Sequence, residues 1–256
     1  MKIATWNVNS LRVRLPHLQT WQQQATIDVI ALQETKTPDS EFPLGDLQAL
    51  GLHPVFNGQR TYNGVAILSS TPPENVVHGI PGFDDEQRRV LAASVQGVRV
   101  INVYVPNGQT LISAKYQYKL RWLNALTEYV RNELAQHRKL VLLGDFNIAP
   151  EDRDVHDPKA WEGSVLVSEA ERNALRELMS LGLIDVFRNF EQADKSFSWW
   201  DYRAAGFRRN AGLRIDLILC SQEMSDTCVG CLVDKEPRTL ERPSDHTPVI
   251  AEFAHR

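Results

Sequence analysis

Short apolar runs recur along this chain, and several of them end abruptly at polar residues. Residues 140–143 lead through a single glycine to Asp145 and Asn147, and residues 29–32 lead to Glu34. Apolar runs of this length, bounded by polar or turn-forming residues, predict buried strands. A rigid strand end fixes polar groups at the mouth of a cleft, so these positions are candidates for chemistry.

Four further apolar runs carry polar residues in the same way. These residues are Asn7 and Asn9 after 3–6, Tyr104 and Asn107 after 100–103, Asp216 within 213–219, and Asp245 and His246 before 248–253. Acids, amides, a phenol and an imidazole at the ends of separate strands predict one convergent site assembled from distant segments of the chain.

Three stretches show apolar residues at helical spacing. The strongest predicts a helix over residues 115–135. A second helix is predicted to begin after Ser168, whose side chain forms a capping box with Glu171, and to end near Gly182. A third is predicted over residues 15–24.

The alternation of strands and helices places the chain in the α/β class. We expect a single domain over residues 1–256, and we predict loops at 38–43, 71–73 and 148–161. Periodicity alone fits either a doubly wound parallel sheet or a layered sandwich. Residues 62–105 and 213–253 are rich in strands with short connections, which favours substantial antiparallel pairing.

The composition is typical of a globular protein and excludes a membrane-spanning one. Hydrophobic residues make up 43% of the 256 residues and charged residues 23%, which is typical of a globular protein. No apolar stretch approaches the roughly 20 residues that a membrane span needs. The N-terminus lacks the architecture of a signal peptide, so we expect a cytoplasmic protein.

The charge pattern is ambiguous for a nucleic-acid-binding protein. The formal net charge is −4, whereas many such proteins carry a basic face. Two local basic clusters offset this, namely Arg203, Arg208, Arg209 and Arg214, and Lys115, Lys119 and Arg121. They are either solvated faces or contacts to a phosphate backbone.

The three cysteines predict no disulfide framework, because their number is odd and no signal peptide precedes them. Cys228 and Cys231 form a lone C-x-x-C motif. No further ligands for zinc stand nearby in the sequence, so we interpret the cysteines as buried or incidental thiols.

The local motifs, taken in order, resemble the exonuclease III branch of the endonuclease/exonuclease/phosphatase superfamily. The matching segments are Trp6-Asn7-Val8-Asn9-Ser10, Leu32-Gln33-Glu34-Thr35-Lys36, Tyr62-Asn63-Gly64-Val65-Ala66, Tyr104-Val105-Pro106-Asn107-Gly108, Gly144-Asp145-Phe146-Asn147, Leu213-Arg214-Ile215-Asp216 and Ser244-Asp245-His246. The resemblance covers essentially the whole chain. It implies a four-layer α/β sandwich, in which two facing mixed β-sheets are flanked by helices and the cleft lies along one edge.

The resemblance also implies a metal-dependent phosphodiester hydrolase that acts on double-stranded DNA. A hard divalent cation, Mg²⁺ or Mn²⁺, would neutralise charge on the phosphoryl oxygens. Glu34 is the first expected ligand. The resemblance places the other donors around this metal region, and they are Asn7, Asp145, Asn147, Asp245 and His246.

The expected catalytic residues are Tyr104, Asp145, Asn147, Asp216 and His246. Asp216 is expected to orient His246, which would align or deprotonate the attacking water. Asp145 is the rival base, or the acid that protonates the leaving group, and the sequence does not choose between them. By resemblance, Tyr104 and Asn107 reach the scissile phosphate.

An aromatic segment, residues 197–202, is the expected DNA-facing element, since aromatic faces stack on exposed bases. The resemblance implies a pocket for an unusual nucleotide formed by Trp199, Leu213 and Ile215, while Trp200 is expected in the core. Bulky apolar residues around Leu166 could exclude a flipped abasic sugar and favour 3′-terminal nucleotides.

The expected activities are 5′ incision at abasic sites, 3′-to-5′ trimming and 3′-end processing, or a combination, by a monomer. Two alternatives stay open at this point. The first is a phosphatase of the same superfamily that acts on phosphoinositide or phospholipid headgroups. The second is a DNA-binding module with an inactive site, although all core positions carry competent residue types.

Overall fold

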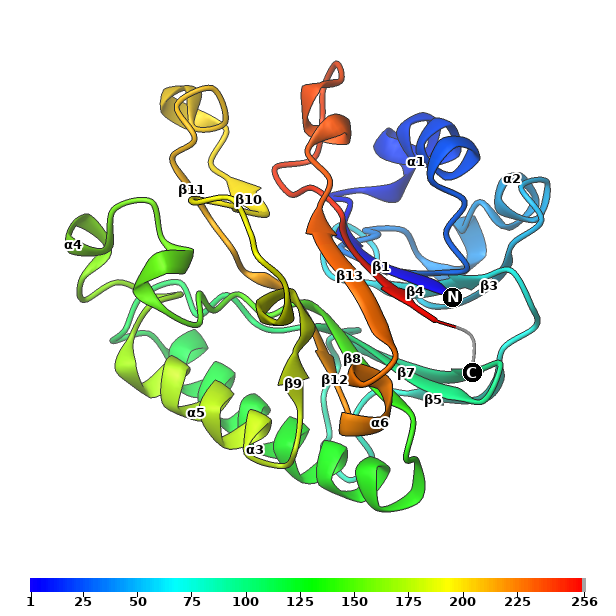
Figure 1. Ribbon diagram of the computed structural model, residues 1–256, viewed down its shortest axis with the longest axis horizontal. Helices are drawn as coiled ribbons and strands as arrows, with labels where there is room; N and C mark the ends of the chain where they lie inside the picture. The colour runs from blue at the N-terminus through cyan, green and yellow to red at the C-terminus, as the bar shows by residue number, and fades with distance from the viewer. Residues whose placement is uncertain (255–256) are drawn as a thin grey trace.

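The computed structural model describes residues 1–254, and its core is two six-stranded β-sheets (Figure 1). In order across the first sheet lie β13 (Cys228–Val233), β14 (Val249–Phe253), β1 (Lys2–Asn7), β2 (Val29–Gln33), β4 (Val65–Ser69) and β3 (His53–Asn57). In order across the second lie β5 (Glu74–His78), β6 (Val90–Val95), β7 (Val98–Tyr104), β8 (Leu140–Asp145), β12 (Asp216–Cys220) and β9 (Ile184–Asp185).

Both sheets are mixed. The pairs β1–β2 and β7–β8 are parallel, and the other pairs in the described chain are antiparallel. A short ribbon of β10 (Trp199–Trp200) and β11 (Gly212–Leu213) rises from the edge of the second sheet.

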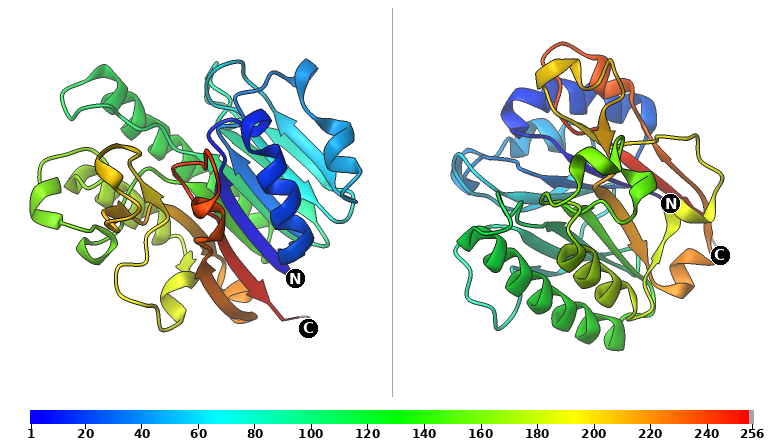
Figure 2. Two further views of the ribbon diagram at one scale, coloured as in Figure 1. Left: turned by 90° about the horizontal axis from the view of Figure 1, so that it is seen from above. Right: turned by 90° about the vertical axis from the view of Figure 1, so that its left-hand side faces the viewer.

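Helices cover the outer faces of the two sheets (Figures 1 and 2). Helices α1 (Leu11–Ala25) and α2 (Leu44–Gln48) lie against the first sheet, and α3 (Ala114–Gln136) and α5 (Glu169–Met179) lie against the second. The result is the predicted four-layer sandwich, whose sheets face each other. No helix in the described residues is both long and apolar enough to cross a bilayer.

Shorter helical elements complete the described chain. They are α4 (Pro158–Trp161), α6 (Gln222–Ser225), and the 3₁₀ turns η1 (Asp39–Glu41), η2 (Asp152–Asp154), η3 (Val186–Asn189), η4 (Arg203–Ala205) and η5 (Glu236–Thr239).

Three apolar layers hold the sandwich together. Between the sheets, residues such as Ile3, Val141 and Leu143 are fully buried, because alternate residues of each strand point inward. Trp122 of α3 and Trp21 of α1 anchor the two outer layers. Each fully buried side chain of this size contributes about 1.5–3 kcal/mol to folding.

The helix predictions largely match the structure. Helix α3 departs by one residue at each end from the predicted range, and the hydroxyl of its N-cap Ser113 accepts a hydrogen bond from the backbone of Tyr116. The capping box of Ser168 and Glu171 at the start of α5 is confirmed. Helix α5 ends at Met179, before the predicted stop, and α1 begins four residues earlier than predicted, at Leu11.

Three segment predictions need correction. The predicted loops at 38–43 and 148–161 contain η1 and, in the second case, η2 and α4. The run 213–219 is not one strand, because β11 ends at Leu213 and β12 begins at Asp216. Between them the backbone N–H of Arg214 donates to the Asp154 carbonyl and that of Ile215 to the Ser198 hydroxyl, instead of to a neighbouring strand.

The two basic clusters also need correction. Arg214 is 1% exposed and lies 2.6 Å from Asp154, and Lys119 is fully buried against Glu171. Neither side chain is available to a phosphate backbone. A buried charge must be paired, and the acids that pair with these two come from distant parts of the chain. The three cysteines are free thiols, as expected.

Candidate active site

The register of the second sheet places three candidate residues in a row. Tyr104 at the end of β7 is opposite Asp145 at the end of β8, and Asp145 is opposite Asp216 at the start of β12. In the first sheet, Asn7 at the end of β1 is opposite Gln33, so that Glu34 follows immediately. The polar ends of both sheets therefore meet at one edge of the sandwich.

Gly144 allows this row to form. Its φ is +149°, and a Cβ atom added there would lie 1.9 Å from the carbonyl oxygen of Val103 on the neighbouring strand. Since any side chain would force β7 and β8 apart, the residue before Asp145 has to be glycine.

Asn7 joins the two sheets at the centre of the site. Its Nδ2 donates to Glu34 Oε1 at 2.8 Å and to Asp145 Oδ2 at 2.9 Å, while its Oδ1 accepts from the backbone of Asn9. One amide group thus holds two carboxylates side by side.

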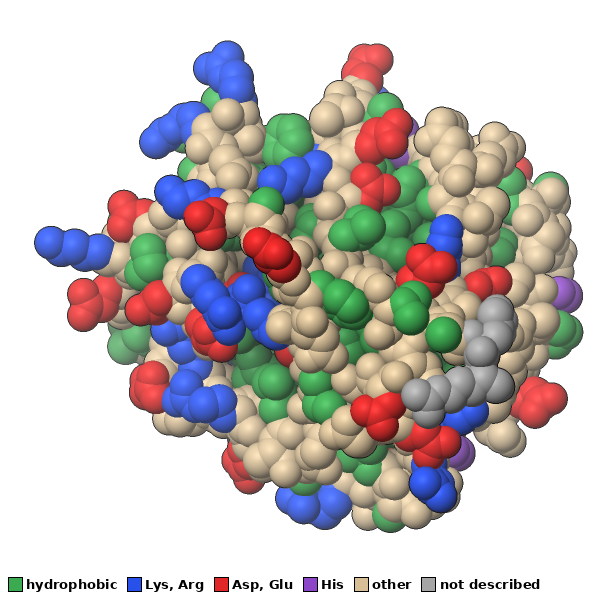
Figure 3. Space-filling view, viewed as in Figure 1, with side chains coloured by type: hydrophobic (Ala, Val, Ile, Leu, Met, Phe, Trp, Pro, Cys, Tyr) green, Lys and Arg blue, Asp and Glu red, His purple; other side chains and the backbone are tan. Residues whose placement is uncertain are grey.

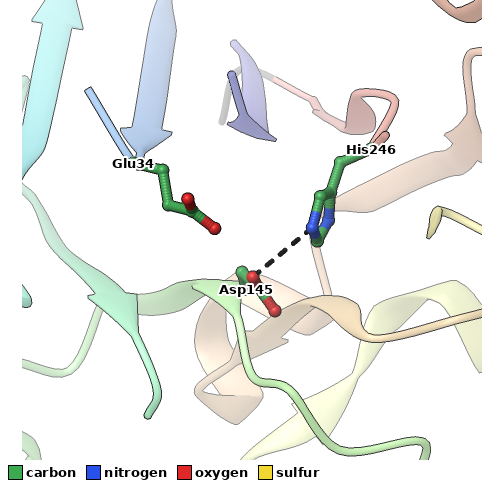
Figure 4. Close-up of side chains that lie close together, drawn as sticks. All are labelled: Glu34, Asp145 and His246. Carbon is green, nitrogen blue, oxygen red and sulfur yellow. Dashed lines mark ion pairs between the residues drawn. The ribbon is translucent and has the colours of Figure 1, made fainter. Parts of the chain in front are cut away.

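The side chains of Glu34, Asp145 and His246 point toward one another (Figure 4). One potential ligand atom from each lies within 4.8 Å of the others, which is close enough for a single metal ion. Two carboxylates are suitable ligands for a hard divalent cation, and Asn7 presents its Nδ2 to them while its oxygen accepts from Asn9. Within the described residues, this is the only cluster of acids, histidines and cysteines with such spacing.

His246 lies between two carboxylates. Its Nδ1 is 2.9 Å from Asp216 Oδ2, and its Nε2 is 3.6 Å from Asp145 Oδ2. Burial alone would lower the pKa of His246, but the negative charges of Asp216 and Asp145 outweigh burial and raise it. Burial raises the pKa of Asp145, although the neighbouring His246 opposes this change.

Lys36 lies beside the site. In the sequence it belongs to the motif around Glu34, but it was not assigned a role. Its ammonium is 2.9 Å from Glu34 Oε2 and donates to Asn9. Burial would raise the pKa of Glu34, yet Lys36 and Asn7 together lower it, so the carboxylate is ionised. Glu34 and Lys36 both have positive φ, a strained conformation that clusters at functional sites.

Tyr104 is held by Arg89, which sequence reasoning missed. The guanidinium of Arg89 lies 4.5 Å from the centre of the Tyr104 ring and donates to the Tyr104 carbonyl. Burial, together with Glu34 and Asp145, raises the pKa of Tyr104, so the phenol keeps its proton. An arginine directly before a strand, as Arg89 is before β6, has no distinctive pattern in the sequence.

Two amides lie beside this group. Asn107 donates to Asn147 Oδ1 at 3.2 Å, and Asn147 donates to the Val105 carbonyl and to Asp145. Asn147 has a φ of +49°, and its backbone N–H donates to Asp145 Oδ1. The turn after β8 therefore fixes the orientation of the acid.

The structure does not bring Asp245 into the cluster of Glu34, Asp145 and His246. Its two oxygens accept hydrogen bonds from Asn9 Nδ2 at 2.9 Å and from Trp199 Nε1 at 3.0 Å. Asp245 therefore links the start of the chain to the aromatic ribbon.

The three residues expected to form a nucleotide pocket lie together in one apolar cluster. Leu213 and Ile215 are 0% and 1% exposed, and they pack in one apolar cluster with Leu166, which is 4% exposed. Trp199 covers the cluster at its edge. As expected, Trp200 is fully buried.

A cleft of about 720 Å³ opens beside the site. Tyr104 and Asn107 line one side of it, and Arg89, Lys115 and Tyr118 contribute to the rest of its wall. Further basic side chains project from the loop between β10 and β11 (Figure 3), where Arg203, Arg208 and Arg209 are exposed. The site is therefore bordered by positive charge that can face an extended anion.

The site has the parts that hydrolysis of a phosphate ester needs. It offers oxygen ligands for a cation, a paired acid and imidazole for proton transfer, and neutral donors that can contact phosphoryl oxygens.

Similar proteins carry the same architecture. Exodeoxyribonuclease III of Haemophilus influenzae is 35% identical over 266 residues, which cover 99% of this chain and all of the relative. The 3′ phosphatase NExo from Neisseria, solved with a product DNA hairpin, is 51% identical with a TM-score of 0.98 over the full length of both chains. An AP endonuclease from Archaeoglobus fulgidus is 39% identical with a TM-score of 0.96, again over both full chains.

A family comparison agrees with these likenesses. Residues 4–246 match the endonuclease/exonuclease/phosphatase family, and this range includes all of the strand-end residues described above. The chain therefore belongs to the endonuclease/exonuclease/phosphatase family and, within it, to the branch of exodeoxyribonuclease III.

Proposed function

We propose that this chain is a DNA repair nuclease of the exodeoxyribonuclease III type, which hydrolyses phosphodiester bonds with the help of a divalent cation. The convergence of Glu34, Asp145 and His246 with the Asp216 carboxylate carries the proposal. The full-length similarity to exodeoxyribonuclease III, to a 3′ phosphatase solved with product DNA and to a 3′-5′ exonuclease from Neisseria meningitidis supports it.

We assign the cation, Mg²⁺ or Mn²⁺, to the carboxylates of Glu34 and Asp145, which Asn7 holds together. A divalent cation bound there supplies charge neutralisation at the phosphate. Asn147 is a weaker candidate because its amide oxygen is uncharged, and Asp245 is weaker because it lies outside the cluster of Glu34, Asp145 and His246.

We assign the base to Asp145 and a charge-stabilising role to His246. An imidazole that faces a carboxylate at each ring nitrogen is held protonated, so it cannot accept a further proton. In this scheme Asp145 accepts the proton of the attacking water, the water oxygen bonds to phosphorus, and the bond between phosphorus and the leaving oxygen breaks as that oxygen takes a proton from solvent. The Nε2 proton of His246 would then donate to a phosphoryl oxygen.

Neutral donors next to the base would bind the same phosphate. The Tyr104 phenol keeps its proton, so it can donate to a phosphoryl oxygen without adding negative charge. Asn107 borders the cleft beside Tyr104 and can contact the scissile phosphate as well.

We propose further that 3′ ends are the preferred substrates. Leu166 is buried in one apolar cluster with Leu213 and Ile215, and Trp199 packs against this cluster, so we infer that Leu166 leaves too little room for a flipped abasic sugar. The neighbouring structure at 51% identity is described as a 3′ phosphatase, which is consistent with this preference.

The alternatives from the sequence are less well supported. A headgroup phosphatase would share the core motifs, but the relatives reported above are DNA enzymes by name. We also propose that the enzyme acts as a monomer, because one chain supplies Glu34, Asp145 and His246. We propose a cytoplasmic location on the likeness to the bacterial exodeoxyribonuclease III.

Cleavage of three labelled duplexes, each with Mg²⁺ and with EDTA, tests the proposal. One duplex holds an internal abasic-site analogue, one has a recessed 3′ hydroxyl and one has a 3′ phosphate. We expect metal-dependent processing of the two 3′ ends and weak internal incision. Strong internal incision would refute the closed pocket, and no cleavage of any duplex would refute the nuclease.

A further inference from the structure

A buried ion pair lies directly behind the proposed active site. Lys119 on α3 and Glu171 in the first turn of α5 are both fully buried, and Nζ lies 2.5 Å from Oε1. Burial lowers the pKa of Lys119, and the charge of Glu171 opposes that change. Replacing such a pair with apolar residues is often neutral for stability, so stability is a weak explanation for its presence.

The ammonium of Lys119 reaches the two loops that carry the site amides. It donates to the carbonyl of Asn147 at 2.7 Å and to the carbonyl of Asn107 at 3.1 Å. With the bond to Glu171, all three of its protons are used. The backbones that present the two amides to the site are therefore tied to one buried charge.

The carboxylate of Glu171 holds the third loop. Besides Lys119, it accepts hydrogen bonds from the backbone N–H of Leu166 at 3.1 Å and from the N–H and hydroxyl of Ser168. Leu166 has a φ of +74°, a strained conformation for a residue with a branched side chain. The bond to Glu171 helps to hold it there, and this conformation directs its side chain into the cluster with Leu213.

We infer that Lys119 and Glu171 are positioning residues, which fix Leu166 relative to Asn107 and Asn147 and so set both the rate and the choice of substrate. The inference rests on the proposed function, since the rate and the choice concern that site. The pair connects the segment that closes the nucleotide pocket to the amides that contact the phosphate.

The chain offers a matched control pair. Arg99 and Glu133 also form a buried ion pair with a shortest distance of 2.5 Å, and Glu133 lies on the same helix as Lys119. Arg99 contacts the Asn75 carbonyl instead of a loop of the site. Lys119→Met and Glu171→Gln are therefore compared with Arg99→Met and Glu133→Gln.

The test measures kcat and KM on the recessed 3′ end and on the abasic duplex, well below the melting temperature of each full-length variant. Lys119→Met and Glu171→Gln should lower kcat for 3′ trimming about 10- to 100-fold with KM little changed, and should raise the ratio of incision to trimming. The control variants should lower the melting temperature but leave kcat and the ratio within about twofold. Equal losses of kcat in both pairs would overturn the inference.

Hydrogen exchange of the Leu166 amide gives a readout that does not depend on activity. Glu171→Ala, which removes the acceptor, should reduce protection of this amide at least tenfold, and Glu133→Ala should leave it unchanged. Retained protection in Glu171→Ala would refute the positioning role. If the wild-type chain cleaved no duplex, the proposed function would fail, while the exchange result would still decide whether the pair holds the loop.

Discussion

Asn7 and Asp145 are joined by a hydrogen bond of 2.9 Å, although they end strands of two different sheets. The same amide nitrogen bonds to Glu34, so one side chain sets the spacing of two carboxylates that would otherwise repel each other. Through this bond, the packing of one sheet on the other fixes the positions of the carboxylates in the site.

Replacing Asn7 with alanine should therefore disable the site without unfolding the protein. We expect kcat to fall about 100- to 1,000-fold and the Mg²⁺ concentration for half-maximal rate to rise. A Mg²⁺ titration of the cleavage rate measures both effects. Asn132→Ala on the exposed face of α3 is the control, and equal rates in the two variants would contradict the assignment.

Asp216→Asn should impair catalysis through His246. The amide cannot hold the imidazole as the carboxylate at 2.9 Å does, so the ring loses both its orientation and its stabilised charge. A loss of about 100- to 10,000-fold in kcat is expected, with circular dichroism unchanged. A variant that turned over within twofold of wild type would rule out the dyad.

Leu166→Gly should open the nucleotide pocket. The substitution removes the side chain that packs on Leu213 and Ile215, and glycine tolerates the φ of +74°. Incision of the abasic duplex should rise at least tenfold relative to 3′ trimming, as gel-resolved products would show. Val165→Gly, which alters the adjacent and less buried residue, should leave the ratio near its wild-type value.

Gly144→Ala should destabilise the fold strongly, because the new Cβ atom would lie 1.9 Å from a backbone oxygen. We expect a loss of about 3 kcal/mol or more in the free energy of unfolding by urea. Gly182→Ala is the matched comparison, since its φ is also positive but its Cβ would meet open space. There the cost should be about 1 kcal/mol. Similar losses at both glycines would count against the close approach of β7 and β8.

Stability should decline at alkaline pH through buried phenols. Burial, with the charge of Glu133, raises the pKa of Tyr129 to about 12, whereas an unfolded tyrosine titrates near 10. Its contribution is therefore complete below about pH 10 and is lost as the pH rises through 12, because the unfolded chain releases its proton first.

Tyr129→Phe should flatten this decline by up to about 1.4 kcal/mol per pH unit, as urea unfolding between pH 9 and 12 would measure. Tyr62→Phe, at a phenol that is 68% exposed, should leave the slope unchanged. An unaltered slope in Tyr129→Phe would show that this phenol does not carry the effect.

Much of this site could be predicted, because an apolar run that stops at a polar residue indicates the end of a strand. The apolar runs before Glu34 and Asp145 are continuous, and both strands lie in the middle of a sheet. The sequence does not single out the edge strands β5 and β13 within the segments expected to be rich in strands, because few of their residues are buried and they show little periodicity.

Charged residues were harder to place. Arg214 and Lys119 read as surface charges, since nothing local reveals that Asp154 and Glu171 will pair with them in the interior. The role of Arg89 depends on its packing against the Tyr104 ring. This contact between distant residues cannot be predicted from the local sequence.

The order of strands along the chain has a consequence for synthesis. Strand β1 is made long before its antiparallel neighbour β14 and the imidazole of His246. A chain released between these points would lack the partner of Asp216 and one side of the first sheet. The catalytic centre is thus complete only once His246 has been made, so that chains terminated before it should not attack the genome.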